Sequence, residues 1–332
     1  MPDSFERQRK SVLVLGASGF VGSRLVAALS ESLAYRPIAA SRRAGLSVDA
    51  TNAAAVRAAL RDVDYVVNCI AGNGRTMTTS TQVLCDAARA NPPVRIVHLS
   101  SMAIYGAATG TVAEDRAPVS PVSDYGVAKM TCEQIVRKYV HDGGDAVILR
   151  PTCVFGPGSP QWTTRVAHLL LARRLGDLGT AGDGCCNLAF IDDLVAGIIC
   201  ALSARGVSGR AFNISSSSAL TWNEFLLRFG KALGATPVRR ISQRRLKLET
   251  KLLAPARRIA KRGFPGMGVG EAITPSLLAL MGQDIHIDCS AAASMLSLPR
   301  TSAERMIAVA VNRWMNERAT GRPVARMEPA RP

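Results

Sequence analysis

The chain has 332 residues, of which 48% are hydrophobic and 20% are charged. This balance is typical of a globular protein and excludes a disordered one, and the length allows one large domain or one domain with a smaller second one. No apolar run reaches the roughly 18 residues of a membrane-spanning helix, and segment 1–10 lacks the apolar centre of a signal peptide, so we expect a cytoplasmic protein.

The formal net charge of +16 raises the question of anionic partners. Much of the excess lies between Arg239 and Arg262 and in the C-terminal tail. We expect no nucleic-acid partner, because no recognition helix, zinc-finger spacing or aromatic platform accompanies these charges. Leucines and an isoleucine are interleaved with the cations. Two interpretations of this stretch therefore stay open: a solvated helix face, and peripheral contact with an anionic membrane surface.

The eight cysteines show no Cys-x-x-Cys spacing, and the four histidines are scattered. Most of the cysteines lie inside apolar stretches, which is typical of small buried thiols in a reducing compartment. We therefore predict no disulfide framework and no metal site.

The first predicted elements are a buried strand over 11–15 and a helix from Phe20, joined by a turn with Gly16, Gly19 and Gly22. Glycine suits a turn with positive φ or a close phosphate, and the start of the helix offers unpaired N–H groups. The spacing G-x-x-G-x-x-G favours dinucleotide binding over an ordinary glycine-rich turn. The contacts expected here come from Gly16, Ser18, Gly19, Phe20, Val21 and Gly22.

A second strand is predicted over 36–41, and Arg42 and Arg43 follow it directly. Sites that prefer NAD place Asp or Glu at this point to bind the 2′-hydroxyl of the adenosine ribose. Guanidinium groups pair instead with a 2′-phosphate. We therefore expect NADP as the favoured cofactor and NAD as the alternative, with a pair of exposed loop arginines as the competing explanation.

Helices over 53–60 and 76–91 alternate with strands over 63–71, 94–99 and 145–149. This rhythm predicts an α/β fold with a doubly wound parallel sheet, and ligands bind such sheets at the carboxyl ends of the strands. A further helix is expected to begin at Tyr125, after the capping pair Ser123 and Asp124, and its Lys129 lies one turn later on the same face.

The pattern loosens after residue 150. We predict a dinucleotide-binding Rossmann domain over 11–180, whose core includes 188–215, and a mainly substrate-binding region over 181–320, with tails at 1–10 and 321–332. The later elements are expected to be a helix from about residue 161, a strand over 188–191, a helix capped by Asp192 and Asp193, a strand over 211–214, a helix opened by a capping box at Thr221 and Glu224, a Pro/Gly-rich loop over 264–275, and a final helix over 302–320.

Five motifs occur in a fixed order along the chain. They are Gly16/Gly19/Gly22, Ser-Ser-x-x-x-Tyr-Gly at 100–106, Tyr-x-x-x-Lys at 125–129, Arg-Pro with Phe-Gly-Pro-Gly at 150–158, and Ile-Asp-Asp-Leu at 191–194. With these motifs the chain resembles the extended short-chain dehydrogenase/reductase family, the NAD-dependent epimerase/dehydratase group, over about residues 11–235. The resemblance implies an NAD(P)-dependent enzyme with a small-molecule substrate, and a homodimer formed through the two helices beside the third and fourth strands.

The resemblance also assigns catalytic roles to Ser101, Tyr125 and Lys129. Tyrosine has an ordinary pKa of about 10. Lys129, together with an oxidised nicotinamide, is expected to lower the pKa of Tyr125, so that the phenol exchanges a proton with the substrate. Lys129 also holds the nicotinamide ribose, and Ser101 binds the reacting oxygen; a surface pair on an amphipathic helix is the alternative for Tyr125 and Lys129. Further cofactor contacts implied by the family are Asp49, Ala50, Cys69, Ile70, Ala71, Ser100, Pro151 and Val154.

Two departures from the family pattern bear on the reaction. Met102 and Ala103 stand where the family's dehydratases carry Asp-Glu, which argues against dehydration. If Asp288 is the Asp of the C-terminal motif, no arginine precedes it over 274–287, where UDP-sugar epimerases carry one. We expect hydride transfer at a secondary alcohol or ketone, with a nucleotide sugar as the leading substrate class. The alternatives are a nucleotide-sugar epimerase with retained NAD and a non-catalytic cofactor-binding subunit.

Overall fold

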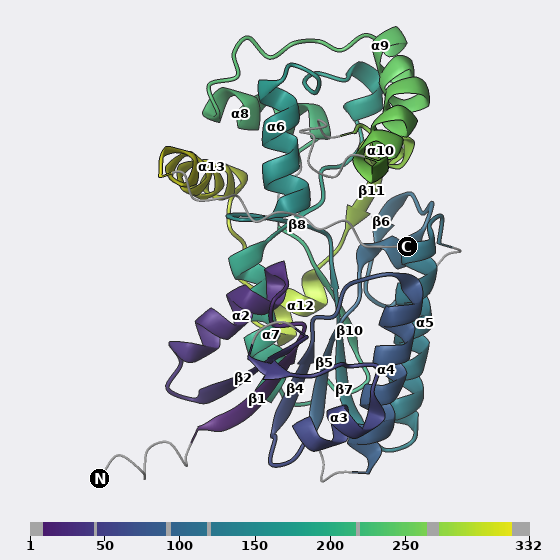
Figure 1. The fold of residues 1–332 in the computed structure, drawn as a ribbon, viewed down its shortest axis with the longest axis vertical. Coiled ribbons are helices and arrows are strands. Elements are labelled where there is room, and N and C mark those ends of the chain that lie inside the picture. Colours follow the sequence, from purple (N-terminus) through teal and green to yellow (C-terminus); the bar gives the residue numbers. More distant parts are fainter. Residues whose placement is uncertain are drawn as a thin grey trace.

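The computed structural model describes residues 9–42, 45–90, 94–117, 121–216, 220–263 and 272–320. Its centre is a seven-stranded sheet with the order β10-β7-β5-β4-β1-β2-β3 (Figure 1). Every neighbouring pair is parallel, which confirms the predicted α/β fold with a doubly wound sheet. The strands are β1 (Lys10–Leu15), β2 (Tyr35–Ser41), β3 (Leu46–Ser47), β4 (Tyr65–Asn68), β5 (Arg95–Leu99), β7 (Asp145–Pro151) and β10 (Ala211–Ile214).

Helices cover both faces of this sheet (Figure 1). Val12 and Val14 of β1 belong to one hydrophobic core, while Leu13 and Leu15 belong to another on the opposite face of the sheet. A strand buried on both faces reads as a continuous apolar run, which is why β1 is visible in the sequence. The first face carries α2 (Phe20–Ser30) and α7 (Ile191–Ser203), and the second carries α3 (Ala53–Ala59), α4 (Gly74–Arg89) and α5 (Asp124–His141).

The sheet changes winding direction between β1 and β4. The chain first moves outward from β1 to β2 and β3, and then returns to β4 on the other side of β1. Loops at the carboxyl ends of β1 and β4 therefore separate and leave a crevice, which is where open parallel sheets bind their ligands.

Outside the central sheet the chain forms two small parallel sheets, and most of the later helices gather at one end of that sheet, whereas α12 (Ser290–Met295) packs against β10 (Figure 1). The strands are β6 (Gly110–Val112) with β11 (Ile285–Ile287), and β8 (Cys153–Phe155) with β9 (Leu188–Phe190). The helices are α6 (Arg165–Leu171), α8 (Trp222–Ala232), α9 (Gln243–Leu248), α10 (Ala254–Gly263), α11 (Pro275–Met281), α12 (Ser290–Met295) and α13 (Ala303–Ala319), with short turns η1 (Met102–Tyr105), η2 (Pro160–Thr164), η3 (Gly179–Gly182) and η4 (Glu249–Leu253).

Helix starts follow the predicted capping chemistry at two places and differ at a third. Ser123 caps α5, and Thr221 opens α8 with the predicted capping box. The prediction that Asp192 and Asp193 cap a helix is wrong, because α7 has no side-chain cap. Asp192 instead pairs with Arg24, and Asp193 accepts hydrogen bonds from Thr301.

The basic stretch forms one continuous helical segment, α9, η4 and α10. Most of the predicted Pro/Gly-rich loop, residues 264–271, lies outside the described residues. Across the described ranges, no helix combines the length and the apolar character needed to cross a bilayer.

Candidate active site

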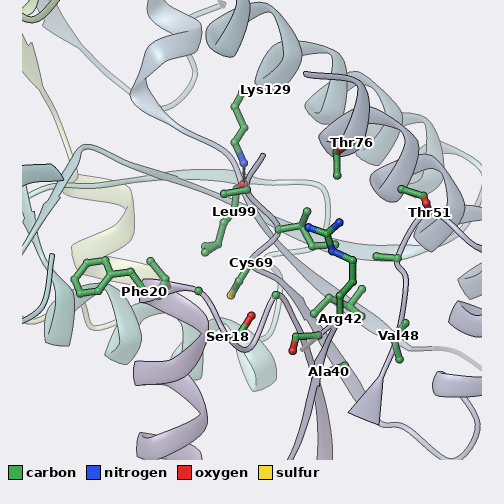
Figure 2. A pocket seen from close by; sticks show the side chains of 18 of the residues that line it. Ser18, Phe20, Ala40, Arg42, Val48, Thr51, Cys69, Thr76, Leu99 and Lys129 are labelled. Atoms are coloured by element: carbon green, nitrogen blue, oxygen red, sulfur yellow. Dashed lines mark hydrogen bonds between the residues drawn. The ribbon is translucent and has the colours of Figure 1, made fainter. Parts of the chain in front are cut away.

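A cavity of about 440 Å³ opens along the carboxyl ends of β1, β2, β4, β5 and β7, at the reversal point of the sheet (Figure 2). It gathers predicted residues from seven separate segments of the chain, because neighbouring parallel strands end at one edge. The predicted residues that line it are Gly16, Ser18, Gly19, Phe20, Val21, Arg42, Asp49, Ala50, Cys69, Ile70, Ala71, Ser100, Tyr125, Lys129, Pro151 and Val154.

Two other predicted residues, Gly22 and Ser101, do not line this cavity. Gly22 is buried in the first turn of α2. Ser101 caps η1, where its hydroxyl accepts a hydrogen bond from the Ala103 N–H at 3.2 Å. Arg43 lies outside the described residues.

The glycine turn brings β1 and α2 close together. Gly16 has φ +80°, and a Cβ there would lie 2.9 Å from the Cys69 carbonyl oxygen. A Cβ on Gly22 would lie 2.3 Å from the Gly16 carbonyl oxygen. The first N–H groups of any helix lack acceptors within the helix. In α2 no side chain at the N-cap accepts from them. This turn fits a phosphate group, because anions are stabilised at an uncapped helix N-terminus.

A cation and an anion meet at the outer end of the cavity. Arg42 is exposed and reaches into the cavity from the end of β2 (Figure 2). The Asp49 carboxylate accepts hydrogen bonds from the Thr51 N–H at 3.0 Å and the Thr51 hydroxyl at 2.8 Å. These bonds, with a smaller contribution from Arg42, hold the pKa of Asp49 below its usual range. Arg42 thus offers a guanidinium to a phosphate, and Asp49 stays ionised beside it.

Lys129 enters the cavity from α5 and is only 4% exposed. Its ammonium donates a hydrogen bond of 2.7 Å to the Leu99 carbonyl oxygen at the end of β5, as Figure 2 shows. Burial lowers the pKa of Lys129 from its usual value. The nitrogen lies 5.8 Å from the centre of the Tyr125 ring. One helix therefore delivers both side chains to the cavity, and the strand carbonyl fixes where the ammonium sits.

The expected lowering of the Tyr125 pKa is not what the protein alone produces. The Tyr125 residue is 44% exposed, but its hydroxyl end faces the protein. Desolvation there raises the pKa of Tyr125 above its ordinary value, although a hydrogen bond with Ser101 acts in the opposite direction. Lys129 does not reverse this shift, since its ammonium is directed to the Leu99 carbonyl oxygen. The expected lowering therefore depends on the positive charge of an oxidised nicotinamide, and it stays a prediction.

Ser100 provides a test of whether a polar ligand fits this cavity. Its side chain is 2% exposed, and its hydroxyl has no hydrogen-bond partner in the described parts of the chain. Burial of an unpaired hydroxyl is unfavourable, and Ser100 lines the cavity. The residues present thus fit a nucleotide cofactor at two points, the uncapped turn and this buried hydroxyl.

A buried network behind the predicted catalytic residues was not foreseen from the sequence. Arg150 donates to Glu133 through both Nε and Nη2, at 2.9 and 2.8 Å. Arg150 Nη1 also donates to the Tyr105 hydroxyl at 2.8 Å, and that hydroxyl donates to Asn213 Oδ1 at 2.7 Å. Two signals in the sequence could have revealed this network. Glu133 lies one turn after Lys129 on the same helix, and Arg150 is a charged residue at the end of an apolar strand.

Several lining residues were also missed: Leu15, Ala40, Ser41, Val48, Thr51, Thr76 and Leu99. Five of these lie at or next to the last residue of a strand: Leu15, Ala40, Ser41, Val48 and Leu99. Strand ends border the same crevice as the loops that follow them, but the sequence motifs lie mainly in those loops.

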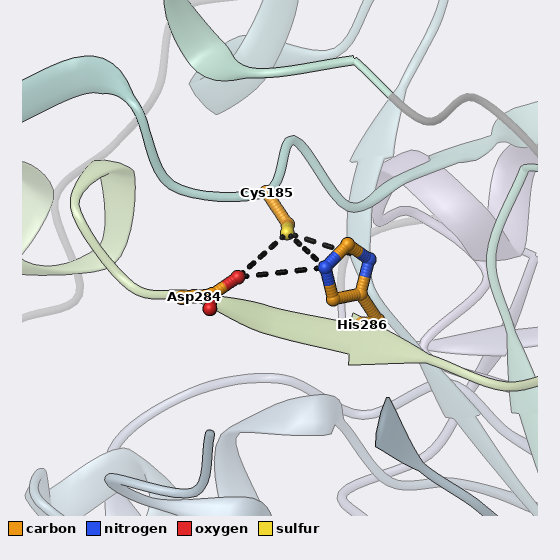
Figure 3. Close-up of side chains that lie close together, drawn as sticks. All are labelled: Cys185, Asp284 and His286. Atoms are coloured by element: carbon orange, nitrogen blue, oxygen red, sulfur yellow. Dashed lines mark hydrogen bonds and ion pairs between the residues drawn. The ribbon is translucent and has the colours of Figure 1, made fainter. Parts of the chain in front are cut away.

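The prediction of no metal site stays a prediction, but three potential metal ligands lie together outside this cavity. Cys185, Asp284 and His286 lie close together, with potential ligand atoms that are all within 4.8 Å of one another (Figure 3). Ninety-nine residues separate Cys185 from Asp284. Scattered positions in the sequence therefore did not reveal this cluster.

Comparison with known proteins gives consistent results. The model of the NAD dependent epimerase/dehydratase family matches residues 12–215. The 2'-dehydrokanamycin reductase of Streptomyces kanamyceticus is 29% identical over 241 residues, which is 69% of this chain and 68% of that protein. The dTDP-6-deoxy-L-talose 4-dehydrogenase (NAD(P)(+)) of Kitasatospora kifunensis is 34% identical over 172 residues, covering 45% and 54% of the two chains.

Among solved structures, the UDP-glucuronic acid 4-epimerase of Bacillus cereus in complex with NAD shares the fold, with a TM-score of 0.70 and 21% identity. The superposition covers 92% of this chain and 99% of that one. This chain spans only 59% and 44% of the lengths of two other curated relatives that it matches.

Proposed function

Because the chain belongs to the NAD dependent epimerase/dehydratase family, and is therefore an NAD(P)-dependent enzyme, we propose that it transfers a hydride at a secondary alcohol or ketone with NADP as its preferred cofactor. The observation that supports this proposal is the joint lining of one cavity by the glycine turn, Tyr125 and Lys129. A phenol beside a buried ammonium serves proton exchange, whereas a surface pair would not line a cavity that can hold a nucleotide.

The residues divide the cavity into regions for the parts of a dinucleotide. The uncapped turn at Gly16 and Gly19 would hold the diphosphate, and Asp49 would lie at the adenosine end. Lys129 and Ser100 would contact the nicotinamide end. When bound, the nicotinamide supplies or accepts the hydride.

Tyr125 is the proposed proton donor and acceptor. Its hydroxyl interacts with Ser101, so both groups can bind one substrate oxygen. In reduction the Tyr125 hydroxyl gives its proton to that oxygen, and in oxidation the phenolate takes the proton back. The Lys129 ammonium lies 5.8 Å from the centre of the Tyr125 ring and is held by its bond to the Leu99 carbonyl oxygen. Together with an oxidised nicotinamide it would stabilise the phenolate.

Arg42 supports the proposed preference for NADP. Its exposed guanidinium follows β2, where a carboxylate would select NAD. A 2′-phosphate offers Arg42 a charge-assisted bond that a 2′-hydroxyl cannot match.

A nucleotide sugar is the proposed substrate class, in line with the printed substrates of several similar proteins. Met102 and Ala103 follow the catalytic serine without a carboxylate, so dehydration is not part of the proposal. Epimerisation with retained NAD is the second candidate, because the UDP-glucuronic acid 4-epimerase of Bacillus cereus, in complex with NAD, has the same fold. A cofactor-binding subunit without turnover is the third.

A substrate panel separates these candidates. The purified chain is incubated with NADPH or NADH and a set of keto-sugar nucleotides and simple ketones, and absorbance and products are recorded. Net loss of NADPH absorbance supports the reductase. Isomer formation without loss, together with NAD in the denatured protein, supports the epimerase instead, and neither change with any substrate supports the binding subunit.

We also propose contact of the basic helical segment with an anionic bilayer. Leu252 and Ile259 are 64% and 72% exposed on this segment. Its buried acid, Glu249, pairs with Arg174 at 2.7 Å and Arg257 at 2.6 Å. The only acid of the described α9–α10 segment is thus turned inward and neutralised, which leaves cations and apolar side chains outward.

Assembly and location complete the proposal. A homodimer through α4 and α5, which lie side by side in Figure 1, predicts twice the chain mass by light scattering. A cytoplasmic location fits the eight free cysteines, since reducing compartments preserve thiols.

A further inference from the structure

Three side chains with different donor atoms meet beside β11. Cys185 precedes β9, Asp284 directly precedes β11, and His286 lies within β11. Cys185 Sγ lies 3.1 Å from His286 Nε2 and 3.4 Å from Asp284 Oδ1, and the last two atoms are 3.4 Å apart. Figure 3 shows the three side chains pointing toward one another.

These separations are close to those that zinc requires. Zinc binds sulfur at about 2.3 Å and nitrogen or oxygen at about 2.0–2.1 Å, so neighbouring ligand atoms of a tetrahedral site lie about 3.4–3.6 Å apart. The observed distances, the shortest of which is 3.1 Å, would have to open by at most about 0.5 Å. Asp284 and His286 are exposed, so rotation of these two side chains can supply that change.

The geometry differs from that of a Cys-His-Asp catalytic relay. In such a relay the carboxylate binds one imidazole nitrogen and the nucleophile binds the other. Here Asp284 and Cys185 both make their closest approach to Nε2 of His286. Donor atoms that converge on one point are arranged for a cation.

The backbone around the cluster is already fixed. The Cys185 N–H donates to the Gln283 carbonyl oxygen at 3.1 Å, and the Gly184 N–H donates to the Met281 carbonyl oxygen at 3.1 Å. Asn187 donates to the Ile285 carbonyl oxygen at 2.7 Å and accepts from the Ile287 N–H at 3.3 Å. Ordering the ligands therefore costs little, because both segments are held before any ion binds.

We propose that Cys185, Asp284 and His286 form a zinc(II) site with three protein ligands and a fourth position for water or an exogenous ligand. A mixed sulfur, nitrogen and oxygen set favours zinc over magnesium or calcium, which select oxygen ligands. On binding, the Cys185 thiol releases its proton to solvent and forms a sulfur–zinc bond, without any change of oxidation state. None of the three residues lines the cofactor cavity, so the site is independent of the proposed function.

The test uses the full-length chain without an affinity tag, stripped of metal with a chelator and titrated with zinc(II) and cobalt(II). We expect one zinc per chain by elemental analysis, and a thiolate-to-cobalt charge-transfer band. Cys185→Ser and His286→Ala should each lower zinc affinity by at least about 10-fold and abolish or weaken the band. Cys200→Ser is the matched control, because Cys200 is a partly exposed thiol on α7 outside the cluster.

An unchanged circular dichroism spectrum and an unchanged thermal unfolding midpoint of the stripped variants show that they are folded. The absence of stoichiometric zinc binding in the wild-type chain would overturn the proposal. Zinc binding that Cys185→Ser leaves unchanged would overturn it as well, since the ion would then lie elsewhere.

Discussion

Arg150 at the end of β7 and Glu133 on α5 form a two-pronged ion pair in which both side chains are almost fully buried, with exposures of 1% and 2%. The pair ties the helix that carries Tyr125 and Lys129 to the strand that ends at the cofactor cavity. Because Arg150 also binds the Tyr105 hydroxyl, the same guanidinium reaches η1, whose N-cap is Ser101. The proposed catalytic residues are thus positioned from behind by a network whose own members do not line the cavity.

Removal of one partner leaves the other charge buried and unpaired. We expect Glu133→Ala to lower the free energy of unfolding by about 3–5 kcal/mol, measured by urea denaturation. The double variant Glu133→Met with Arg150→Met should be less destabilised than the single variant, because neither charge remains. Gln134→Ala, at the exposed neighbouring position, serves as the control. Equal stability of Glu133→Ala and the wild type would contradict the role of the pair.

Tyr125→Phe removes the phenolic proton and keeps the ring. We expect kcat to fall by about 10²–10⁴-fold, because general acid–base catalysis contributes that much. Affinity for NADPH, measured by fluorescence titration, should stay within a few-fold of the wild type. Tyr65→Phe on β4, outside the cavity, is the matched control. Full activity in Tyr125→Phe would remove Tyr125 from the mechanism.

Arg42→Gln tests cofactor preference. A charge-assisted bond to the 2′-phosphate implies that kcat/KM with NADPH falls by about 10- to 100-fold while the value with NADH is little changed. Arg57→Gln, an exposed arginine on α3, should leave both values unchanged. An equal loss with both cofactors would show that Arg42 acts through folding, and a wild-type preference for NADH would refute the NADP proposal.

His98 predicts a pH dependence of stability. Burial lowers the pKa of His98 to about 3, whereas an unfolded histidine titrates near 6.5. Between these values the unfolded chain binds more protons than the native one, so the free energy of unfolding decreases as the pH falls from about 6.5 towards 3. The contribution of this group is at most about 1.4 kcal/mol per pH unit.

Denaturation of His98→Leu across this pH range should therefore show a smaller slope than the wild type. His141→Leu, at an exposed position at the end of α5, should keep the wild-type slope. Identical slopes for all three proteins would mean that His98 is not held neutral.

Vesicle sedimentation tests the basic helical segment. The double variant Leu252→Glu with Ile259→Glu should bind phosphatidylglycerol vesicles at least about 10-fold more weakly than the wild type, because each buried leucine or isoleucine contributes about 1.5–3 kcal/mol. Leu33→Glu, at a residue that is 95% exposed after α2, is the control. The membrane proposal would be refuted if the wild type bound neutral phosphatidylcholine vesicles as tightly as phosphatidylglycerol vesicles, or bound neither. The segment would then be a solvated helix face.

The sequence by itself determined the features that depend on short spacings. Gly16 and Gly22 revealed the turn because a Cβ at either position would meet the backbone. Tyr125 and Lys129 revealed a shared helix face because four residues make about one turn. The alternation of apolar strands and amphipathic helices predicted the parallel sheet, because helices that connect parallel strands cover both faces of such a sheet.

Only the tertiary structure decided which distant side chains meet. Glu133 and Arg150 are 17 residues apart, and Tyr105 and Asn213 are 108 apart, yet one network joins them. The order of strands, with β7 between β5 and β10, brings these elements together, and no local periodicity encodes that order. The tertiary structure also decided that Asp192 and Asp193 do not cap α7. Asp192 pairs with Arg24 and Asp193 binds Thr301, and both partners come from distant parts of the chain.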